Sequence, residues 1–224
     1  MFVYQHNHRT AGGSFNSALL KQFPGQEVFF DPNERAEDFM PTDIPVGTKA
    51  ATTFRSIAKL TKEPGDVWIT SLRDPVVRVV DMFNFFLLPD PVRGGGHSTL
   101  EYATPSEVYS KAHSVDMREY DNGIVRRLAG VYVPFGMVTA EHLELAKANL
   151  AKFDEVLFQE SFDIDYARVA SKYGWSVAPD LWNAPSADIR PVSFYAKHIP
   201  LLAEANKWDI ALVEHAQALW GRGA

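Results

Sequence analysis

Short apolar runs alternate along the chain with longer segments of helical periodicity. The apolar runs lie at residues 1–5, 27–30, 66–71 and 155–159, and continuous runs of this length are typical of buried strands. Strands that alternate with helices predict an α/β fold, a three-layer αβα arrangement with a central parallel sheet. The predicted helices cover residues 14–21, 49–60, 75–87, 105–114, 119–128, 140–153, 162–173 and 193 to the end.

The bulk composition predicts one domain over residues 1–224. The chain has 224 residues, of which 46% are hydrophobic, enough for one sizeable core. Three loops, residues 31–46, 89–104 and 176–192, interrupt the periodic segments, and loops of this kind often reach the rim of a site.

Charge and cysteine content exclude several classes of function. The net charge of -6 argues against a nucleic-acid-binding surface, which needs many Lys and Arg. No cysteine is present, so disulfides, thiolate zinc sites and cysteine nucleophiles are excluded. The apolar start is too short for a signal peptide, and no run approaches the roughly 18 apolar residues of a membrane span. We expect a cytoplasmic protein with neither nucleic-acid nor membrane partners.

The segment "HNHRTAGGS", residues 6–14, carries the strongest chemical signal. It follows the first predicted strand and opens the first predicted helix. A helix N-terminus presents unpaired N–H groups and a partial positive charge, and glycines let the backbone close around an anion. Arg9 adds a permanent cation, and no Asp or Glu occurs before Glu27. The segment predicts a P-loop-like, phosphate-binding turn formed by Arg9, Thr10, Ala11, Gly12, Gly13 and Ser14.

This turn resembles the opening signature of the sulfotransferases. In that family a strand-loop-helix reading His-x-Pro-Lys-Thr-Gly/Ala-Gly-Thr-Ser holds the 5′-phosphosulfate end of the donor PAPS (3′-phosphoadenylyl sulfate). Here His8 stands in place of the usual Pro and Arg9 in place of the usual Lys. The resemblance implies that residues 9–14 bind the donor.

A second segment, "LRDPVVRVVD", resembles the family signature Leu-Arg-Asp-Pro-x-x-Arg-x-x-Ser, whose first Arg and final Ser hold the donor's 3′-phosphate. Arg73 matches, whereas Asp81 stands where the Ser is expected. An aspartate about 4 Å from a phosphate would cost about 4 kcal/mol per pair of unit charges at an effective dielectric constant of 20. Three explanations remain open: Asp81 turns toward Arg78, the donor differs in its 3′ group, or the donor binds weakly.

A third segment, "DNGIVRRLAG", resembles the family's Asp-Asn-x-x-x-Arg-x-Leu-x-Gly. Asn122 and Arg126 lie four residues apart, so one helix face can direct both toward a shared pocket. With His97 in the glycine-containing loop, they are the candidate acceptor-binding residues. A fourth matching segment, residues 145–175, is mostly architectural, and Glu160 within it could orient a neighbour or react.

The resemblance is to the carbohydrate-type branch, which includes heparan 2-O- and chondroitin 4-O-sulfotransferases, and spans approximately residues 2–175. It implies a sulfotransferase that moves a sulfuryl group from PAPS, as co-substrate, to a hydroxyl of a carbohydrate or small-molecule acceptor without a metal. Such transfer needs an in-line acceptor, a base and cations that neutralise the leaving phosphate.

Arg9 is the candidate for stabilising the leaving oxygens, and the base is less well defined. Several relatives carry a His near the position of Lys49, but a lysine could accept the proton only if its pKa fell well below about 10.4. His6 is the next candidate, and His97 could approach an acceptor. A metal site on His6 and His8 would lack an evident third ligand.

Two alternatives stay open. A P-loop kinase would use ATP, but its Gly-x-x-x-x-Gly-Lys-Ser/Thr loop is missing, as is an obvious Mg²⁺-binding carboxylate. A non-catalytic, sulfotransferase-like protein would keep the fold and bind a nucleotide.

Overall fold

The computed structural model describes residues 1–31, 38–87, 104–111, 115–180 and 191–221. Within them, five strands form one parallel sheet in the order β2-β3-β1-β4-β5. The sheet confirms the predicted α/β class. The strands are β1 (Phe2–Gln5), β2 (Val28–Phe30), β3 (Ala50–Thr53), β4 (Val67–Leu72) and β5 (Glu155–Phe158).

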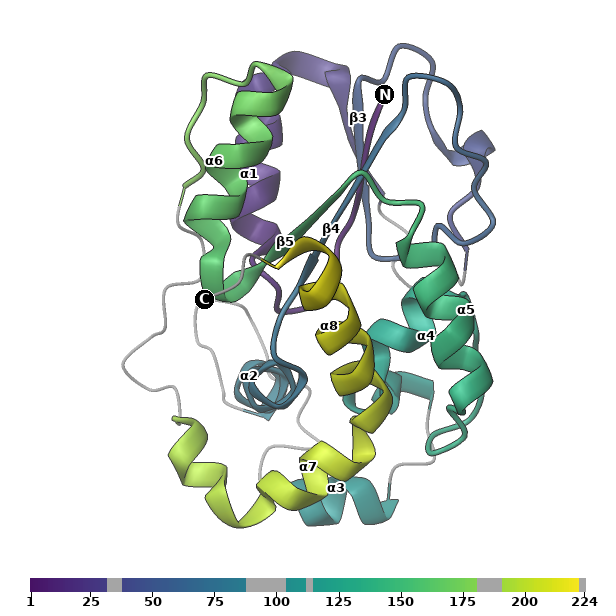
Figure 1. Ribbon diagram of the computed structural model, residues 1–224, viewed down its shortest axis with the longest axis vertical. Coiled ribbons are helices and arrows are strands. Elements are labelled where there is room, and N and C mark those ends of the chain that lie inside the picture. The colour runs from purple at the N-terminus through teal and green to yellow at the C-terminus, as the bar shows by residue number, and fades with distance from the viewer. Residues whose placement is uncertain (32–37, 88–103, 112–114, 181–190, 222–224) are drawn as a thin grey trace.

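Helices cover both faces of the sheet. α1 (Gly12–Gln22) and α6 (Phe162–Tyr173) lie side by side on one face, and α4 (Gly123–Ala129), α5 (Ala140–Leu150) and α8 (Lys207–Trp220) lie on the other. The three layers agree with the sequence prediction. A further group lies beyond the carboxyl ends of the strands (Figure 1): α2 (Pro75–Leu87), α3 (Pro105–Lys111) and α7 (Ile199–Ala205).

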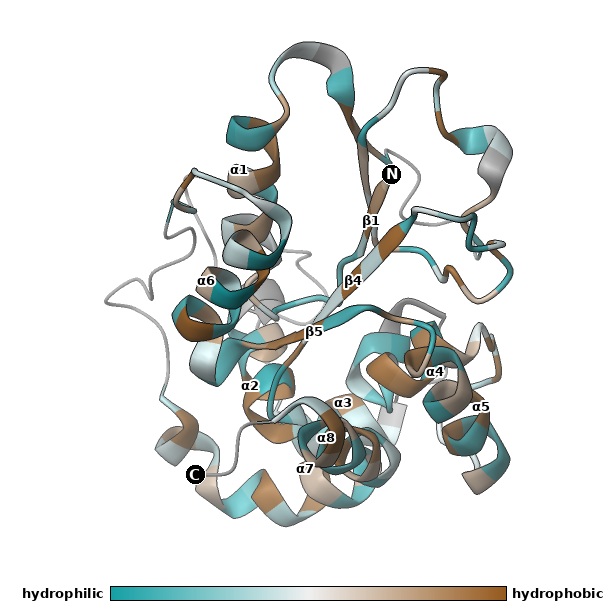
Figure 2. Cartoon of the chain, turned by 45° about the horizontal axis from the view of Figure 1, so that its top comes forward, coloured by the Kyte–Doolittle hydropathy of each residue, from teal (hydrophilic) through white to brown (hydrophobic). Residues whose placement is uncertain are grey.

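Three apolar clusters correspond to these groups of helices. Alternate strand residues point to opposite faces, so Tyr4 and Ile69 pack with α1 and α6, whereas Val3 and Trp68 pack with α4, α5 and α8. Figure 2 shows the apolar residues along β1 and β4 that supply both layers. The third cluster joins α2, α3 and α7 and includes Phe83.

Local signals explain where α2 and α6 begin and end. The Asp74 carboxylate accepts a hydrogen bond from the Val77 N–H at 2.8 Å, and Pro75 opens α2, where its missing N–H costs nothing. Gly174 ends α6 in the left-handed conformation, with φ 68°, which favours glycine.

The prediction of a helix over residues 49–60 is wrong. The segment begins with β3, which is fully buried between β2 and β1. Its sequence, Ala-Ala-Thr-Thr, has no strong apolar run, so the strand forms because its position in the sheet supplies partners on both edges, which overrides local preference.

Two predicted helices are divided in the structure. The segment 119–128 is interrupted at Asn122, whose left-handed φ of 51° ends a 3₁₀ turn over Val115–Tyr120 before α4 starts. The C-terminal helix consists of a 3₁₀ turn over Val192–His198 followed by α7 and α8, with Asn206 between them. In the described residues, no helix is both long enough and apolar enough to cross a membrane.

Candidate functional site

The candidate site lies at the carboxyl ends of β1 and β4. These two strands are neighbours in the sheet, and their connections leave in different directions, β1 into α1 and β4 into α2. Open α/β sheets bind ligands where neighbouring connections diverge in this way. The segments containing Arg9 and Arg73 therefore start from the same edge of the sheet.

The loop between β1 and α1 is fastened to the end of β4. The Asn7 amide donates to Oγ1 of Thr70 and to the Ser71 carbonyl, each at 3.0 Å. The Thr10 hydroxyl, fully buried, donates to the Asn7 carbonyl at 2.8 Å and contacts Oγ of Ser71 at 2.8 Å. The Thr10 side chain thus shapes the loop that the sequence predicts to bind phosphate.

The backbone of the loop is unusual at two non-glycine positions. Arg9 and Ala11 have φ values of 63° and 64°, in the left-handed region that such residues rarely adopt. α1 then begins at Gly12 with no acidic residue in its first turn and no side-chain cap. Its N–H groups and dipole favour an anion at this end.

Arg9 and Arg73 converge on one carboxylate, that of Asp81. Nε and Nη2 of Arg9 lie 3.3 and 3.1 Å from Oδ2 of Asp81, and Nη1 of Arg73 lies 2.6 Å from the same oxygen. Nη1 of Arg73 also donates to the Arg9 carbonyl at 3.1 Å. All three side chains are largely buried, with exposed fractions of 16% to 18%. The two cations that sequence analysis assigned to opposite ends of a donor thus share one anion position.

The suggested pairing of Asp81 with Arg78 is wrong. Arg78 is fully buried and is held by Glu119 and Asp209: its Nη1 lies 3.3 Å from Oε2 of Glu119, and its Nη2 lies 3.4 Å from Oδ2 of Asp209. Asp209 also accepts hydrogen bonds from two N–H groups of α4. Arg78 therefore joins α2 to the C-terminal helices and is already neutralised.

Glu119 and Arg127 belong to this charged cluster, although sequence analysis did not select them. Arg127 pairs with Glu119 and donates to the His6 carbonyl. Burial disfavours the Glu119 charge, but Arg127, His8 and Arg78 outweigh this and lower its pKa to about 2. The third signature contains Arg127 beside Arg126, but only the tertiary structure shows which of the two faces the loop.

His6 and His8 form an aromatic stack with Phe54 beside the loop, with ring centroids 4.1 and 4.4 Å from the Phe54 ring. Burial lowers the pKa of His6 well below its usual value, and nearby His8 and Arg127 act in the same direction. Burial also lowers the pKa of His8 to about 4, although Glu119 opposes the change. Both rings are neutral at physiological pH.

The His8 environment predicts a loss of stability in acid. Below pH 6.5 His8 is protonated in the unfolded chain, whereas in the folded protein it stays neutral until about pH 4. The contribution of His8 to the free energy of unfolding is therefore present above pH 6.5 and is lost as pH falls. Because His8 is partly exposed, screening reduces the effect, and we expect about 1–2 kcal/mol. His8→Phe, which can keep the stack, should show a smaller fall in the free energy of unfolding between pH 7 and 4.5.

The measurement is urea denaturation of both proteins at each pH. Burial raises the pKa of Asp209 to about 6, so the contribution of Asp209 to stability grows as pH falls, opposite to that of His8. Because Asp209 is present in both proteins, its contribution cancels in the comparison. Parallel pH profiles for the wild type and His8→Phe would contradict the assignment.

Lys49 is not at the site. It precedes β3 at the amino edge of the sheet, where its carbonyl accepts from the Phe2 N–H, and the cluster of arginines lies at the carboxyl edge. Its side chain is 60% exposed, and its ammonium group pairs with Glu27 at 2.9 Å. The prediction of Lys49 as the base is therefore wrong, because the missed strand β3 carries it to the far edge.

Asn122 and Arg126 are structural rather than acceptor-binding. The Asn122 side chain accepts from the Trp208 and Asp209 N–H groups and so caps α8. Arg126 is buried against Asp121 and the carbonyls of Val133 and Pro134. The third predicted acceptor residue, His97, lies outside the described residues.

Glu160 orients the second signature. Its Oε1 accepts from the Asp74 N–H at 2.9 Å, which fixes the turn that follows Arg73. Of the two roles that the sequence left open for Glu160, the orienting one is observed.

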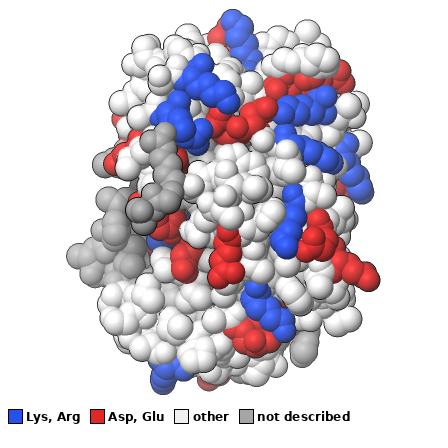
Figure 3. Space-filling model, viewed as in Figure 1, with Lys and Arg blue, Asp and Glu red and all other residues white. Residues whose placement is uncertain are grey.

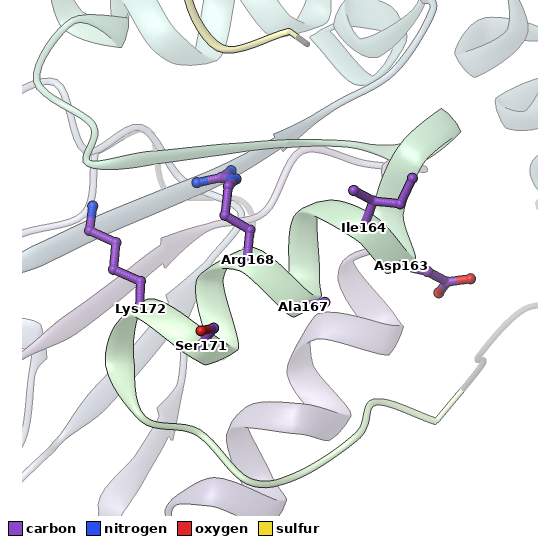
Figure 4. A pocket seen from close by; sticks show the side chains of 6 residues that line it. All are labelled: Asp163, Ile164, Ala167, Arg168, Ser171 and Lys172. Atoms are coloured by element: carbon purple, nitrogen blue, oxygen red, sulfur yellow. The ribbon is translucent and has the colours of Figure 1, made fainter.

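A shallow depression elsewhere does not belong to this site. It is lined by α6 alone, and Figure 4 shows its six side chains on that helix. Its two cations, Arg168 and Lys172, are both held by the buried Glu155. On the face shown in Figure 3, acidic and basic side chains are interspersed. Within the described part of the chain, no three His, Asp or Glu side chains are grouped to hold a metal ion.

Comparison with known proteins adds no family assignment. No protein-family model matches the sequence. No curated protein matches it either.

Proposed function

We propose that the chain is a PAPS-dependent sulfotransferase that acts on a hydroxyl of a carbohydrate or small-molecule acceptor. The observation that carries the proposal is the convergence of Arg9 and Arg73 on one carboxylate oxygen, at 3.1 and 2.6 Å. These arginines follow adjacent parallel strands, and each belongs to one of two ordered signatures. A planar guanidinium pair around a single oxygen is suited to phosphate or sulfate recognition.

The N-terminus of α1 supports an anionic ligand at the same edge. The helix has 11 residues and no acidic first turn, so its dipole adds to the two arginine charges. Two buried loop atoms, Nδ1 of His6 and Oδ1 of Asn7, have no hydrogen-bond partner among the described residues. Buried polar atoms are normally bonded, which favours a polar ligand or water at this loop.

In the proposed reaction, Arg9 and Arg73 hold one phosphate of the donor between them, and Arg9 stabilises negative charge on its leaving oxygen. The acceptor hydroxyl loses its proton as its oxygen bonds to sulfur and the sulfur–oxygen bond to the leaving nucleotide breaks. His6 and His8 are both neutral, so either can accept a proton. Their lowered pKa values make them weak bases, which predicts slow transfer.

The alternative of a nucleotide-binding protein without transfer activity is favoured by two observations. Asp81 already pairs with both donor-binding cations, and Lys49 lies at the opposite edge of the sheet. This alternative shares the ligand but differs in turnover, so a screen of hydroxyl acceptors with PAPS separates the two functions.

A thermal-shift comparison tests the ligand. We expect PAP (3′-phosphoadenosine 5′-phosphate), the product of the donor, to raise the melting temperature more than ADP or ATP at equal concentration. A ligand at 100 times its Kd stabilises the folded state by about 2.7 kcal/mol. Stabilisation by ATP with Mg²⁺ and none by PAP would instead support a kinase, and no stabilisation by any of the three would contradict all nucleotide-based proposals.

A further inference from the structure

We propose that Asp81 occupies the anion position of the site and that a donor phosphate binds between Arg9 and Arg73 only by replacing its carboxylate. This inference rests on the proposed function and specifies how the protein controls donor affinity. Asp81 is thereby an affinity-determining residue that competes with the ligand rather than a contact to it.

The pattern of contacts points to this role. All three hydrogen bonds to Asp81 from the two arginines end on Oδ2, so a single oxygen satisfies donors from two different loops. One oxygen of a phosphate or sulfate also carries negative charge and can accept hydrogen bonds from the same two arginines. The carboxylate therefore stands where a ligand oxygen would make these contacts.

Repulsion between like charges disfavours two anions at this one position. Arg78 is neutralised by Glu119 and Asp209, and Arg127 by Glu119. Arg9 and Arg73 both pair with the single carboxylate of Asp81. A phosphate placed beside a bound Asp81 would meet a like charge at short range in a partly buried site.

A movement of α2 as a whole cannot separate Asp81 from the two arginines. Its neighbours on α2, Val80 and Met82, are 2% and 1% exposed in the core cluster with α3 and α7. Release must therefore occur by rotation of the Asp81 side chain. The buried arginine one turn earlier, Arg78, is already paired, so the released carboxylate gains no contact from it. Donor binding then includes the cost of breaking the ion pairs, which weakens the apparent affinity.

The test is calorimetric titration of PAP into the full-length wild type, Asp81→Asn and Asp81→Ser. Asparagine keeps the shape but removes the charge, and we expect PAP to bind each variant at least about tenfold more tightly than the wild type. Asp163→Asn is the matched control, because Asp163 is an exposed residue on α6 and its loss changes the net charge equally. The control should bind like the wild type.

The outcomes separate this inference from the function on which it rests. Equal PAP affinity in the wild type and both Asp81 variants would overturn the role of Asp81 and leave the donor assignment intact. No PAP binding by any protein would overturn the donor assignment, and the inference with it.

If the Asp81 variants do not fold, a crystal structure of the wild type with PAP tests the same point. We expect the Asp81 carboxylate to lie outside hydrogen-bond distance of at least one of the two arginines. Bound PAP with both ion pairs intact would overturn the inference.

Discussion

Replacing Arg78 by methionine is expected to lower the free energy of unfolding by about 3–5 kcal/mol, because it leaves the buried carboxylate of Asp209 without its cation. Arg78 has no exposed surface, and its two partners come from distant parts of the chain. One of them, Asp209, is also fully buried. Methionine has approximately the volume of arginine, so the loss of stability reports the missing charge rather than a cavity.

Urea denaturation at pH 7 measures the change, with Arg78→Lys as the comparison. Lysine keeps the charge but cannot reach both carboxylates with a planar fork, so we expect an intermediate loss. A free energy of unfolding for Arg78→Met within about 1 kcal/mol of the wild type would show that the pair contributes little, as some buried ion pairs do.

Replacing Gly12 by alanine is expected to destabilise the protein by about 1–3 kcal/mol, the usual cost of overfilling a packed site. An added Cβ would lie 1.7 Å from Nε2 of His6, so the His6 ring would have to leave its stack with Tyr4 and Phe54. Because Gly12 opens α1, the same shift would disturb the anion-binding loop and weaken PAP binding.

A double-mutant cycle with His6→Ala isolates the cause. If the clash is with the imidazole, Gly12→Ala should cost at least about 1 kcal/mol less in the His6→Ala background than in the wild type. The free energies of unfolding of the four proteins, measured in urea, give this coupling. Additive losses would mean that Gly12 is required for a reason other than the His6 ring.

The sequence was informative wherever local chemistry determines structure. Residues 66–71 are apolar and continuous, and they form the central strand β4. Asp74 and Pro75 cap and open α2, and Gly174 ends α6. Parallel strands place their carboxyl ends at one edge, so the meeting of Arg9 and Arg73 followed from the predicted order of strands and helices.

The wrong predictions from sequence concern residues whose structure is set by contacts with distant parts of the chain. β3 has weak strand character of its own and forms because β1 and β2 flank it, and missing it placed Lys49 near the site. Asn122 and Arg126 share helical spacing, but partners far along the chain turn Asn122 into a helix cap. The pairing of Asp81 with both donor-binding arginines depends on side-chain geometry that no spacing rule contains.

Calorimetric titration of PAP into the wild type, Arg9→Ala, Arg73→Ala and Lys147→Ala tests the central claim most directly. Lys147 is the control, since it lies on α5, away from the two arginines, and pairs with Glu144 on the same helix. The two-arginine site predicts binding at one site per chain in the wild type and the control. Each arginine variant should bind at least about tenfold more weakly, as expected for loss of a charge-assisted hydrogen bond. Absence of PAP binding by the wild type, or equal affinity in all four proteins, would contradict the account.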